Sequence, residues 1–312
     1  MARGRRTLAA FSLIFALTAA GGCAGDDGRT SPAEPGPSQA GAFPVTVGSV
    51  TLDARPEKIV SLSPTATEVL FAIGAGPQVT AVDDQSDFPA NVPVTDLSGF
   101  QPNAEAIAAK SPDLVVISND INEVVKALTA LKIPVYLAPA ATSLDDAFRQ
   151  WRELGALTGR PTDAESLVHS ADTQITTLVD ALPKREKPLT YYYELGPELY
   201  SATSTTFVGA LLGRAGLTNV ADPADTNGSA GGYPQLNQEF LVKANPDLIF
   251  LADVTCCAQN ATTVGARPGW NTMTAVTAKQ VVGLDDDIAS RWGPRVVDLV
   301  RAVTDAVAAV PA

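Results

Sequence analysis

The single histidine limits the chemistry that this chain can carry out. His169 is the only histidine in 312 residues, and it lies beside charged residues in a helical stretch, where we expect a solvated helix face. A Ser-His-Asp or Cys-His catalytic set would therefore have one base with no nucleophile motif near it. A zinc or manganese site built on several imidazoles is excluded as well. The sequence predicts a protein that is not an enzyme and that holds no bare metal ion.

Two of the three cysteines are adjacent, at Cys256 and Cys257. In an oxidising compartment such neighbours can form a vicinal disulfide, although its geometry is unfavourable. The alternative is a pair of small buried residues in a loop. We expect the oxidised pair, because free thiols rarely persist outside the cytoplasm. We assign no metal to it.

The third cysteine, Cys23, follows an apparent export signal. Three arginines in the first six residues precede an apolar run over 8–20, and small residues then lead to Cys23. The run is shorter than the roughly 20 apolar residues that cross a membrane, so 1–22 is predicted to be a signal peptide. The stretch Ala20-Gly-Gly-Cys23 resembles a bacterial lipobox, except that Ala20 stands where leucine is usual. We expect lipidation of Cys23, with ordinary cleavage and a spare thiol as the alternative.

The segment behind the signal predicts a tether, and the charge of the chain excludes some partners. Residues 24–42 are rich in Gly, Pro, Ser and Asp, so 23–45 is expected to be a flexible, lipid-anchored linker.

The net charge is −12, and removal of a signal with three arginines and no acid takes it to −15. Such an acidic body disfavours nucleic acid and anionic lipid as partners. We predict an exported protein on the outer face of the cell membrane, in contact with the membrane only through its anchor.

The body of the chain contains one unit twice. Residues 103–119 and 237–253 share Asn, Glu, Pro, Asp and Leu at the same spacing. Each copy predicts a short helix capped by Asn with an acid in its first turn, a proline stop, and a buried parallel strand over 114–117 or 248–251. Chance similarity of two common αβ units is the alternative. We favour internal duplication, and hence two related lobes.

Further strand and helix patterns complete the predicted architecture. Strand-like segments lie at 58–62, 133–137, 189–195 and 280–284, and helical ones at 68–73 and 207–214. The run 161–182 contains no glycine and no internal proline, and at 1.5 Å per residue it would extend for about 30 Å. We therefore predict an α/β fold of two αβ lobes with mainly parallel sheets joined by one long helix. The lobes are expected at 46–142 and 184–312, with a helical connection over 143–183.

Taken in order, these motifs resemble the substrate-binding proteins of ABC importers for iron–siderophore complexes, haem and cobalamin. The resemblance is carried by 58–68, 81–89, both copies of the duplicated unit and 287–295. It implies a ligand between two lobes and only a small closure on binding. It also implies a permease and its ATPase as partners. The cargo would be a small cobalt- or iron-containing complex, with no cofactor of the protein's own.

The resemblance also implies which side chains face the ligand, from loops that follow the strands. Aromatic faces would supply apolar contact and a few polar groups would fix orientation. The implied residues are Ser63, Phe88, Phe100, Gln101, Tyr193, Tyr233, Asp287, Arg291 and Trp292. Ordinary packing is the alternative for each aromatic residue, and Trp292 is the strongest candidate among them.

Docking and cargo follow from the same resemblance. Members of this group meet arginines of the permease with one acid on each lobe, and Glu68 stands at the matching place on the first lobe. On the second lobe Gly213 stands where the acid is expected, which favours the alternative of a surface-anchored sensor or interaction protein without transport. Arg291 is the one clear cleft arginine, and haem would require a His, Tyr or Met ligand. We therefore prefer cobalamin to a siderophore or haem as cargo.

Overall fold

The computed structural model describes residues 42–311. The predicted signal over 1–22, the predicted lipidation site Cys23 and most of the predicted tether lie outside the described residues. Within 42–311, no helix has the length and apolar character needed to cross a membrane.

The first lobe is built on a four-stranded parallel sheet in the order β4-β3-β5-β6. Its strands are β3 (Ile59–Leu62), β4 (Val79–Val82), β5 (Leu114–Ile117) and β6 (Val135–Leu137). Its helices are α1 (Pro64–Ala72), α2 (Ala104–Ala108) and α3 (Val124–Ala130), with short 3₁₀ turns η1 (Gly76–Gln78) and η2 (Ile121–Glu123). Strands β3 and β5 are buried at every position, which explains why both are apolar on both faces.

The second lobe holds another four-stranded parallel sheet, in the order β10-β9-β7-β8. Its strands are β7 (Thr190–Glu194), β8 (Thr218–Asn219), β9 (Leu248–Leu251) and β10 (Val281–Gly283). Its helical elements are α6 (Phe207–Arg214), η3 (Asp222–Asp225), α7 (Gln238–Ala244), α8 (Val254–Cys257), α9 (Ala261–Gly265), η4 (Trp270–Thr272), α10 (Thr274–Thr277) and α11 (Asp286–Ser290).

The two sheets have the same topology, as the duplicated sequence unit predicts. When the four strands of each lobe are numbered in chain order, their order across the sheet is second, first, third, fourth in both lobes. The aspartate of the shared Pro-Asp pair also makes equivalent hydrogen bonds in the two lobes. The Asp113 carboxylate accepts the backbone N–H groups of Glu57 and Lys58 before β3, both at 2.9 Å. The Asp247 carboxylate accepts the N–H and the hydroxyl of Thr190 at the start of β7, both at 2.8 Å.

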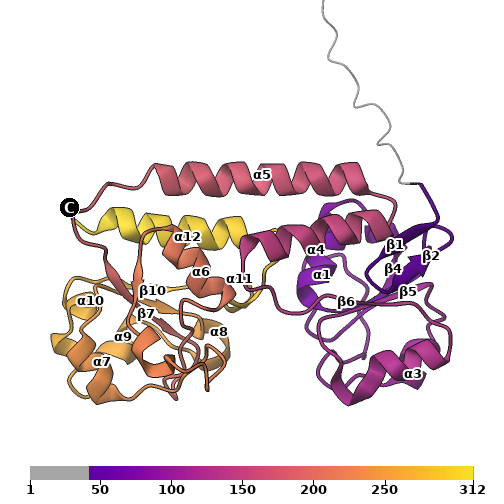
Figure 1. The fold of residues 1–312 in the computed structure, drawn as a ribbon. Helices are drawn as coiled ribbons and strands as arrows, with labels where there is room; N and C mark the ends of the chain where they lie inside the picture. Colours follow the sequence, from indigo (N-terminus) through magenta and orange to yellow (C-terminus); the bar gives the residue numbers. More distant parts are fainter. Residues whose placement is uncertain (1–41, 312) are drawn as a thin grey trace, which may run out of the picture. The chain divides into compact units, whose positions relative to one another are not determined.

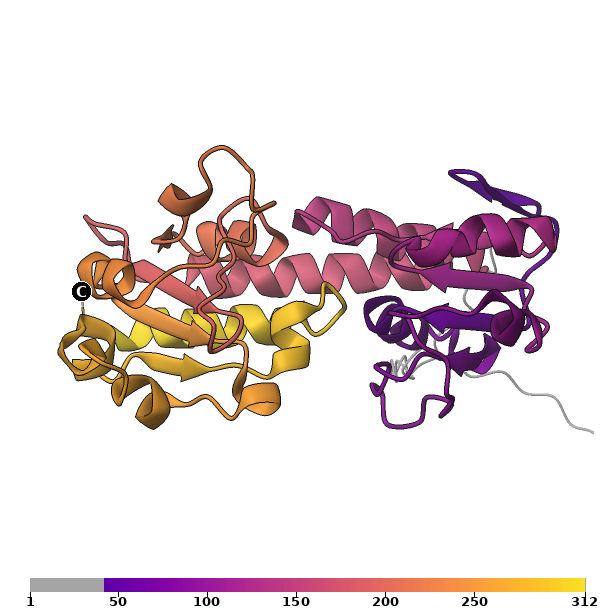
Figure 2. The same ribbon diagram turned by 90° about the horizontal axis from the view of Figure 1, so that it is seen from below.

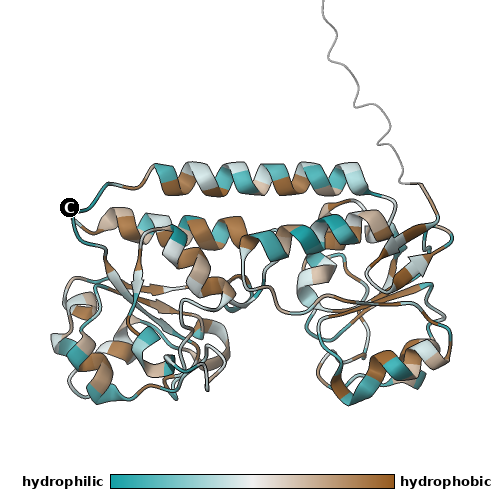
Figure 3. Ribbon diagram, viewed as in Figure 1, coloured by the Kyte–Doolittle hydropathy of each residue, from teal (hydrophilic) through white to brown (hydrophobic). Residues whose placement is uncertain are grey.

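Helices α4 (Leu144–Leu157) and α5 (Pro161–Asp180) connect the sheets, and α12 (Val296–Ala309) returns along α5 (Figure 1). At 20 residues, α5 is about 30 Å long. Gly155 allows α4 and α5 to approach closely, because a Cβ there would lie 2.4 Å from the Cβ of Ala164. Hydrophobic and hydrophilic residues alternate along all three helices, as amphipathic packing requires (Figure 3).

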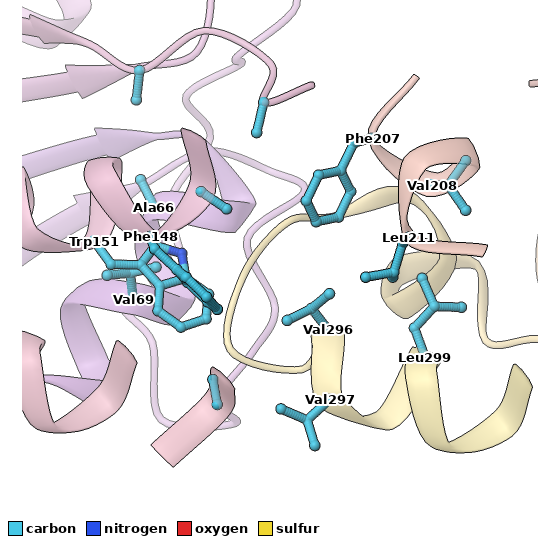
Figure 4. Close-up of a cluster of buried hydrophobic side chains, with 14 of the residues drawn as sticks. Ala66, Val69, Phe148, Trp151, Phe207, Val208, Leu211, Val296, Val297 and Leu299 are labelled. Carbon is cyan, nitrogen blue, oxygen red and sulfur yellow. The ribbon is translucent and has the colours of Figure 1, made fainter. Parts of the chain in front are cut away.

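One hydrophobic cluster passes through the connecting helices and reaches both sheets. Trp151 of α4 is fully buried and packs edge-on against Phe148, with ring centroids 5.2 Å apart. Figure 4 shows this pair beside α1 residues, and Phe207 and Leu211 of α6 near Val296 of α12. Because both lobes share this core, changing their relative position would disturb close packing.

A hairpin at the start of the described residues was not expected from the sequence. Strands β1 (Val45–Val47) and β2 (Val50–Leu52) pair antiparallel around Gly48, whose φ is +55°. Val50 and Leu52 belong to the main hydrophobic cluster. The hairpin therefore packs as part of the first lobe.

Candidate functional site

The carboxyl ends of the strands of the two sheets face each other. Arg291 lies in the segment that follows β10, and its Nη2 donates to the carbonyl of Gln85, in the segment that follows β4, at 3.0 Å. In each sheet the first and third strands are neighbours whose connections leave in opposite directions. Ligands of open α/β sheets bind outside the carboxyl ends of the strands at this switch point. The candidate site is therefore the set of loops at these two edges.

Arg291 binds both lobes. Its Nη1 donates to Glu68 Oε1 and to Asp87 Oδ1 of the first lobe, each at 3.2 Å. Its Nη2 donates to Asp287 Oδ1 of its own lobe at 2.5 Å. Only 11% of the side chain is exposed, so these carboxylates rather than water balance its charge.

Arg295, in the turn that leads into α12, strengthens the same contact. Its Nη2 donates to Glu68 Oε1 at 2.6 Å, and its guanidinium lies 4.3 Å from the ring centroid of Phe88. We call Glu68, Asp87, Asp287, Arg291 and Arg295 the inter-lobe clamp. It contains three carboxylates and two guanidinium groups, so it has no surplus positive charge. Burial raises the pKa of Asp287, and Arg291 opposes that shift.

Glu68 lies between the lobes and not at an outer surface. Its side chain is 1% exposed, and one carboxylate oxygen accepts from both clamp arginines. Its other oxygen has no hydrogen-bond partner within the described residues. It follows the first turn of α1, which contains no acidic residue. Both clamp arginines therefore occupy the Glu68 carboxylate, which the sequence analysis expected to bind the permease. Gly213 on α6 is exposed.

Two of the expected ligand-facing residues are fully enclosed by protein. Ser63 is the N-cap of α1, and its Oγ accepts the N–H of Ala66 at 3.3 Å. Tyr193 of β7 has no exposed surface, and its hydroxyl donates to the carbonyl of Ala289 in α11 at 2.9 Å. Burial raises the pKa of Tyr193. Both side chains support the loops at the site edge from within.

Trp292 joins the clamp to the connecting helices. Its indole N–H donates to Gln150 Oε1 at 2.9 Å, and its carbonyl accepts the indole N–H of Trp151 at 3.1 Å. The ring is half-buried against the shared core. The structure thus gives Trp292 a packing role next to Arg291.

The remaining expected residues are exposed. The exposed fractions are 68% for Phe100, 49% for Tyr233 and 43% for Phe88, and Gln101 is exposed as well. Phe88 also lines a pocket of about 380 Å³ beside the clamp. Partial burial raises the pKa of Tyr233. These side chains form the accessible part of the predicted set.

The loop that carries Phe100 is held close to the end of β4. A Cβ on Gly99 would lie 2.5 Å from Asp83 Oδ2, so any other residue there would displace the Asp83 carboxylate. The N–H groups of Phe100 and Gln101 both point to Ser98 Oγ, at 3.3 and 3.2 Å. These hydrogen bonds fix the backbone position of Phe100, from which its exposed ring extends.

A second charged cluster, which the sequence analysis missed, lies at the switch point of the second sheet. Arg267 donates to both oxygens of Glu194, the last residue of β7, at 2.6 Å each. The fully buried Asp253 follows β9, and neither of its oxygens has a partner within the described residues. Burial, and then the negative charge of Glu194, raise the pKa of Asp253 to about 7. An acid that ends an apolar strand was the available signal for this cluster.

The adjacent cysteines lie at the same edge and are joined by a disulfide in α8. Cys256 is exposed and Cys257 is half-buried. The described residues contain no group of three or more His, Cys, Asp or Glu side chains placed to hold a metal ion. His169 is exposed on α5, on the connecting helix and not on an edge loop.

Two parallel α/β lobes of one topology, with their carboxyl edges opposed and a stiff helical connection, define a two-lobed ligand-binding protein. Residues 59–288 match the family model described as periplasmic binding protein. The chain belongs to the periplasmic binding protein family, which confirms the resemblance seen in the sequence. This is a family of binding proteins, in agreement with the expectation that the chain is not an enzyme.

Named relatives extend over most of the chain. A cobalamin-binding protein of Halobacterium salinarum is 31% identical over 317 residues, covering 96% of this chain and 83% of the relative. An ABC transporter substrate-binding lipoprotein of Bacillus subtilis, YvrC, is 27% identical and covers 85% of this chain and 86% of its own length. A vitamin B12-binding protein of Pectobacterium atrosepticum is 26% identical, with 78% of this chain and 86% of the relative covered.

Solved structures share the fold. The vitamin B12-binding protein BtuF of Vibrio cholerae superposes with a TM-score of 0.67 at 24% identity, covering 81% of this chain and 96% of that protein. A structure titled as a possible iron-binding periplasmic protein of Staphylococcus epidermidis gives a TM-score of 0.70 at 24% identity, with 81% and 99% covered. At these identities the likeness concerns the fold of two lobes and not the ligand.

Proposed function

We propose that this chain is the extracytoplasmic substrate-binding component of an ABC importer and that its cargo is a corrinoid of the cobalamin type. Its family and its cobalamin-binding and transporter-associated relatives support this function. The observation that carries the choice of cargo is the clamp, in which three carboxylates surround Arg291 and Arg295.

The charge of the clamp favours a neutral or cationic ligand. A ferric tris-catecholate is multiply anionic, and a site for it needs guanidinium groups that are free to bind oxygen anions. Arg291 and Arg295 are 11% and 17% exposed, and both are bound to acids of the protein. A corrinoid is large, close to neutral and rich in amide groups. It fits a site made of apolar faces and a few polar groups.

Within this proposal the expected site residues divide into two groups. Phe88, Phe100, Gln101 and Tyr233 supply the surface that the ligand contacts. The second group consists of Ser63, Tyr193, Asp287, Arg291 and Trp292. These hold the edge loops and the spacing of the lobes, because each is tied to protein partners.

Calorimetric titration tests the choice of cargo. The chain is titrated with cyanocobalamin, dicyanocobinamide, haem, a ferric catecholate and a neutral ferric hydroxamate. We expect the two corrinoids to bind below about 10 μM, where the binding free energy exceeds roughly 7 kcal/mol, and the catecholate not to bind. Tight binding of the hydroxamate alone would replace the corrinoid by a siderophore. Binding of none of the five would contradict the function.

A matched pair of variants tests the contact surface. Phe100→Ala removes an exposed ring at the carboxyl edge, and we expect a loss of corrinoid affinity of about tenfold, or about 1.4 kcal/mol. Leu131→Ala is the control, because Leu131 is 55% exposed but follows α3 at the opposite edge of the same sheet. Equal affinity of the two variants would exclude Phe100 from the ligand surface.

For docking to the permease, two other acids fit better than Glu68. The duplicated unit places Glu105 and Glu239 in the first turn of α2 and of α7, respectively. Both side chains are exposed and neither has a hydrogen bond or ion pair within the described residues. One free acid at the equivalent place of each lobe is the arrangement that the resemblance implies, so Gly213 is not a missing docking acid.

Charge reversal tests this assignment. Glu105→Lys and Glu239→Lys, singly and together, are expected to abolish corrinoid-dependent growth while leaving solution affinity unchanged. Glu186→Lys, in the exposed turn before β7, is the control. Normal uptake by the double variant would exclude these acids. Binding without any importer-dependent uptake in the unaltered chain would favour a sensor.

The location is part of the proposal. The signal over 1–22 and Cys23 direct a lipoprotein to the outer face of the membrane, and the relative from Bacillus subtilis is named a lipoprotein. Metabolic labelling with a palmitate analogue should mark the chain, and Cys23→Ser should abolish the label and release the protein from membranes. A labelled Cys23→Ser variant would contradict lipidation at this residue.

A further inference from the structure

The disulfide of α8 lies at the edge of the second lobe where the candidate site is formed. Helix α8 begins three residues after the end of β9, at the carboxyl end of the sheet. In both ribbon views α8 is on the side of its lobe that faces the first lobe (Figures 1 and 2). The disulfide is therefore a neighbour of the site and yet has no part in the function derived above.

The cysteine segment holds α11 in place. The backbone N–H groups of Thr255 and Cys256 donate to the two carboxylate oxygens of Asp286, at 2.9 and 2.8 Å. Asp286 is the first residue of α11, the helix that carries Asp287 and ends at Ser290, immediately before Arg291. The same segment that contains the disulfide thus anchors the helix from which the inter-lobe clamp extends.

The other end of the segment is tied to the buried charges. Gln259 donates from Nε2 to the carbonyl of Cys257 at 3.1 Å, and its Oε1 accepts from Arg267 at 2.8 Å. Arg267 in turn binds Glu194 at the end of β7. A change in the backbone at the two cysteines would therefore alter the hydrogen bonds to α11 on one side and those to the end of β7 on the other.

The disulfide is accessible to thiols and suited to exchange with them. Cys256 is exposed whereas Cys257 is half-buried, so an attacking thiolate reaches the sulfur of Cys256 first. The two Cα atoms are 3.8 Å apart, as consecutive residues must be, which is below the usual span of a disulfide. Bridges outside the usual geometry are more easily reduced.

We propose that Cys256–Cys257 is a thiol–disulfide exchange site whose reaction partner is a thiolate, carried by a small thiol or by a protein dithiol. The thiolate attacks Cys256 Sγ, a mixed disulfide forms, and the electron pair of the broken bond leaves on Cys257. A second thiolate then attacks the sulfur of the bound thiol and releases Cys256. The thiol pair is oxidised to a disulfide, the protein gains two electrons, and both cysteine thiolates take protons from water.

Reduction changes the support of the clamp. The oxidised pair closes an eight-membered ring that restricts the backbone of α8, and opening it restores rotation about the bonds of both cysteines. The bonds to Asp286 then hold α11 less firmly, and Arg291 loses its fixed position. This loss of position predicts that the reduced protein binds corrinoid about tenfold more weakly than the oxidised protein. The prediction rests on the proposed function.

The test uses the full-length chain with Cys23→Ser, which leaves Cys256 and Cys257 as the only cysteines. Glutathione and reduced thioredoxin are used as the two thiolate sources, and thiol release is followed by mass spectrometry. Amide exchange at Thr255 and Cys256 is measured without ligand. We expect reduction by at least one source and at least tenfold faster exchange in the reduced form. A bridge that resists both, or unchanged exchange, would overturn the proposal.

Affinity measurements separate the proposal from the function on which it rests. Oxidised and reduced proteins are titrated with dicyanocobinamide, next to a Cys256→Ser/Cys257→Ser variant. We expect the variant to bind like the reduced protein and to ignore reductant. Equal affinities of the oxidised and reduced forms would refute the coupling while the function stands. If no form binds a metal complex the function fails, and amide exchange still decides whether the exchange site loosens α11.

Discussion

Glu68→Ala is the sharpest test of the inter-lobe clamp. The substitution removes a carboxylate that is 1% exposed and that accepts from Arg291 at 3.2 Å and from Arg295 at 2.6 Å. Breaking a buried pair by removing one partner costs about 3–5 kcal/mol. The lower limit applies here, because Asp87 and Asp287 stay beside the arginines. A loss of about 3 kcal/mol corresponds to a fall in Tm of roughly 6–12 °C.

Thermal and urea unfolding measure this effect directly. Circular dichroism gives the Tm, and the urea midpoint with its m value separates a loss of stability from a change in compactness. Glu105→Ala is the matched control, since it removes the same side chain from an exposed helical position. We expect the control to change the free energy of unfolding by less than about 0.5 kcal/mol.

The two variants also distinguish a clamp from a docking contact. If Glu68 met the permease, Glu68→Ala would stop uptake without changing the Tm. A Tm within about 1 °C of the unaltered chain would show that the clamp contributes nothing in solution. Both arginines would then be free to bind an anion, and the site would no longer favour a neutral cargo.

Three further predictions concern polar side chains inside the lobes and at the starts of strands. Burial raises the pKa of Asp253 to about 7, above its unfolded value near 3.8, so its stabilising effect is complete below about pH 4 and is lost as the pH rises through 7. Asp253→Asn should therefore exceed the unaltered chain in stability at pH 8.5 by up to about 4 kcal/mol, and urea midpoints that differ equally at pH 4.5 and 8.5 would refute this. Trp292→Phe keeps a ring but loses the bond to Gln150, and we expect a cost of about 1–2 kcal/mol in urea unfolding, with no cost if that bond is not made. Asp113→Ala and Asp247→Ala should each cost about 1–2 kcal/mol, because both carboxylates bind two donors at the start of the first strand of their sheet, and unequal losses would contradict their equivalence.

Much of the fold could be predicted because its determinants are local. The strands over 114–117 and 248–251 lie where apolar runs follow Pro-Asp, and the structure confirms both ranges. Helix α5 begins at Pro161, which suits the first helical turn, and ends close to Pro183. Duplication was readable for the same reason, since each copy repeats its own cap, stop and strand.

The site could be predicted only in part, because it depends on contacts between distant segments. Glu68 and Arg295 are 227 positions apart, and nothing near either residue indicates that they pair. Trp292 precedes Gly-Pro in a loop, a context that suits a ligand contact as well as packing, and only the position of α4 decides between them. The motif over 287–295 contains a second arginine, Arg295, and that arginine could have been named as a candidate beside Arg291.

The hydrophobic core shared by the two lobes has a consequence for the speed of capture. A protein that must swing shut around its cargo has an association rate limited by that motion. Here the separation of the lobes is set when the chain folds, since α4, α5 and α12 pack into one cluster with both sheets. Association should then follow a single exponential whose observed rate constant rises linearly with cargo concentration. The slope of that line is the association rate constant, expected at about 10⁵–10⁷ M⁻¹s⁻¹. Because the distance between the lobes is fixed, the protein would select its cargo by thickness, and complexes thicker than that distance would not bind.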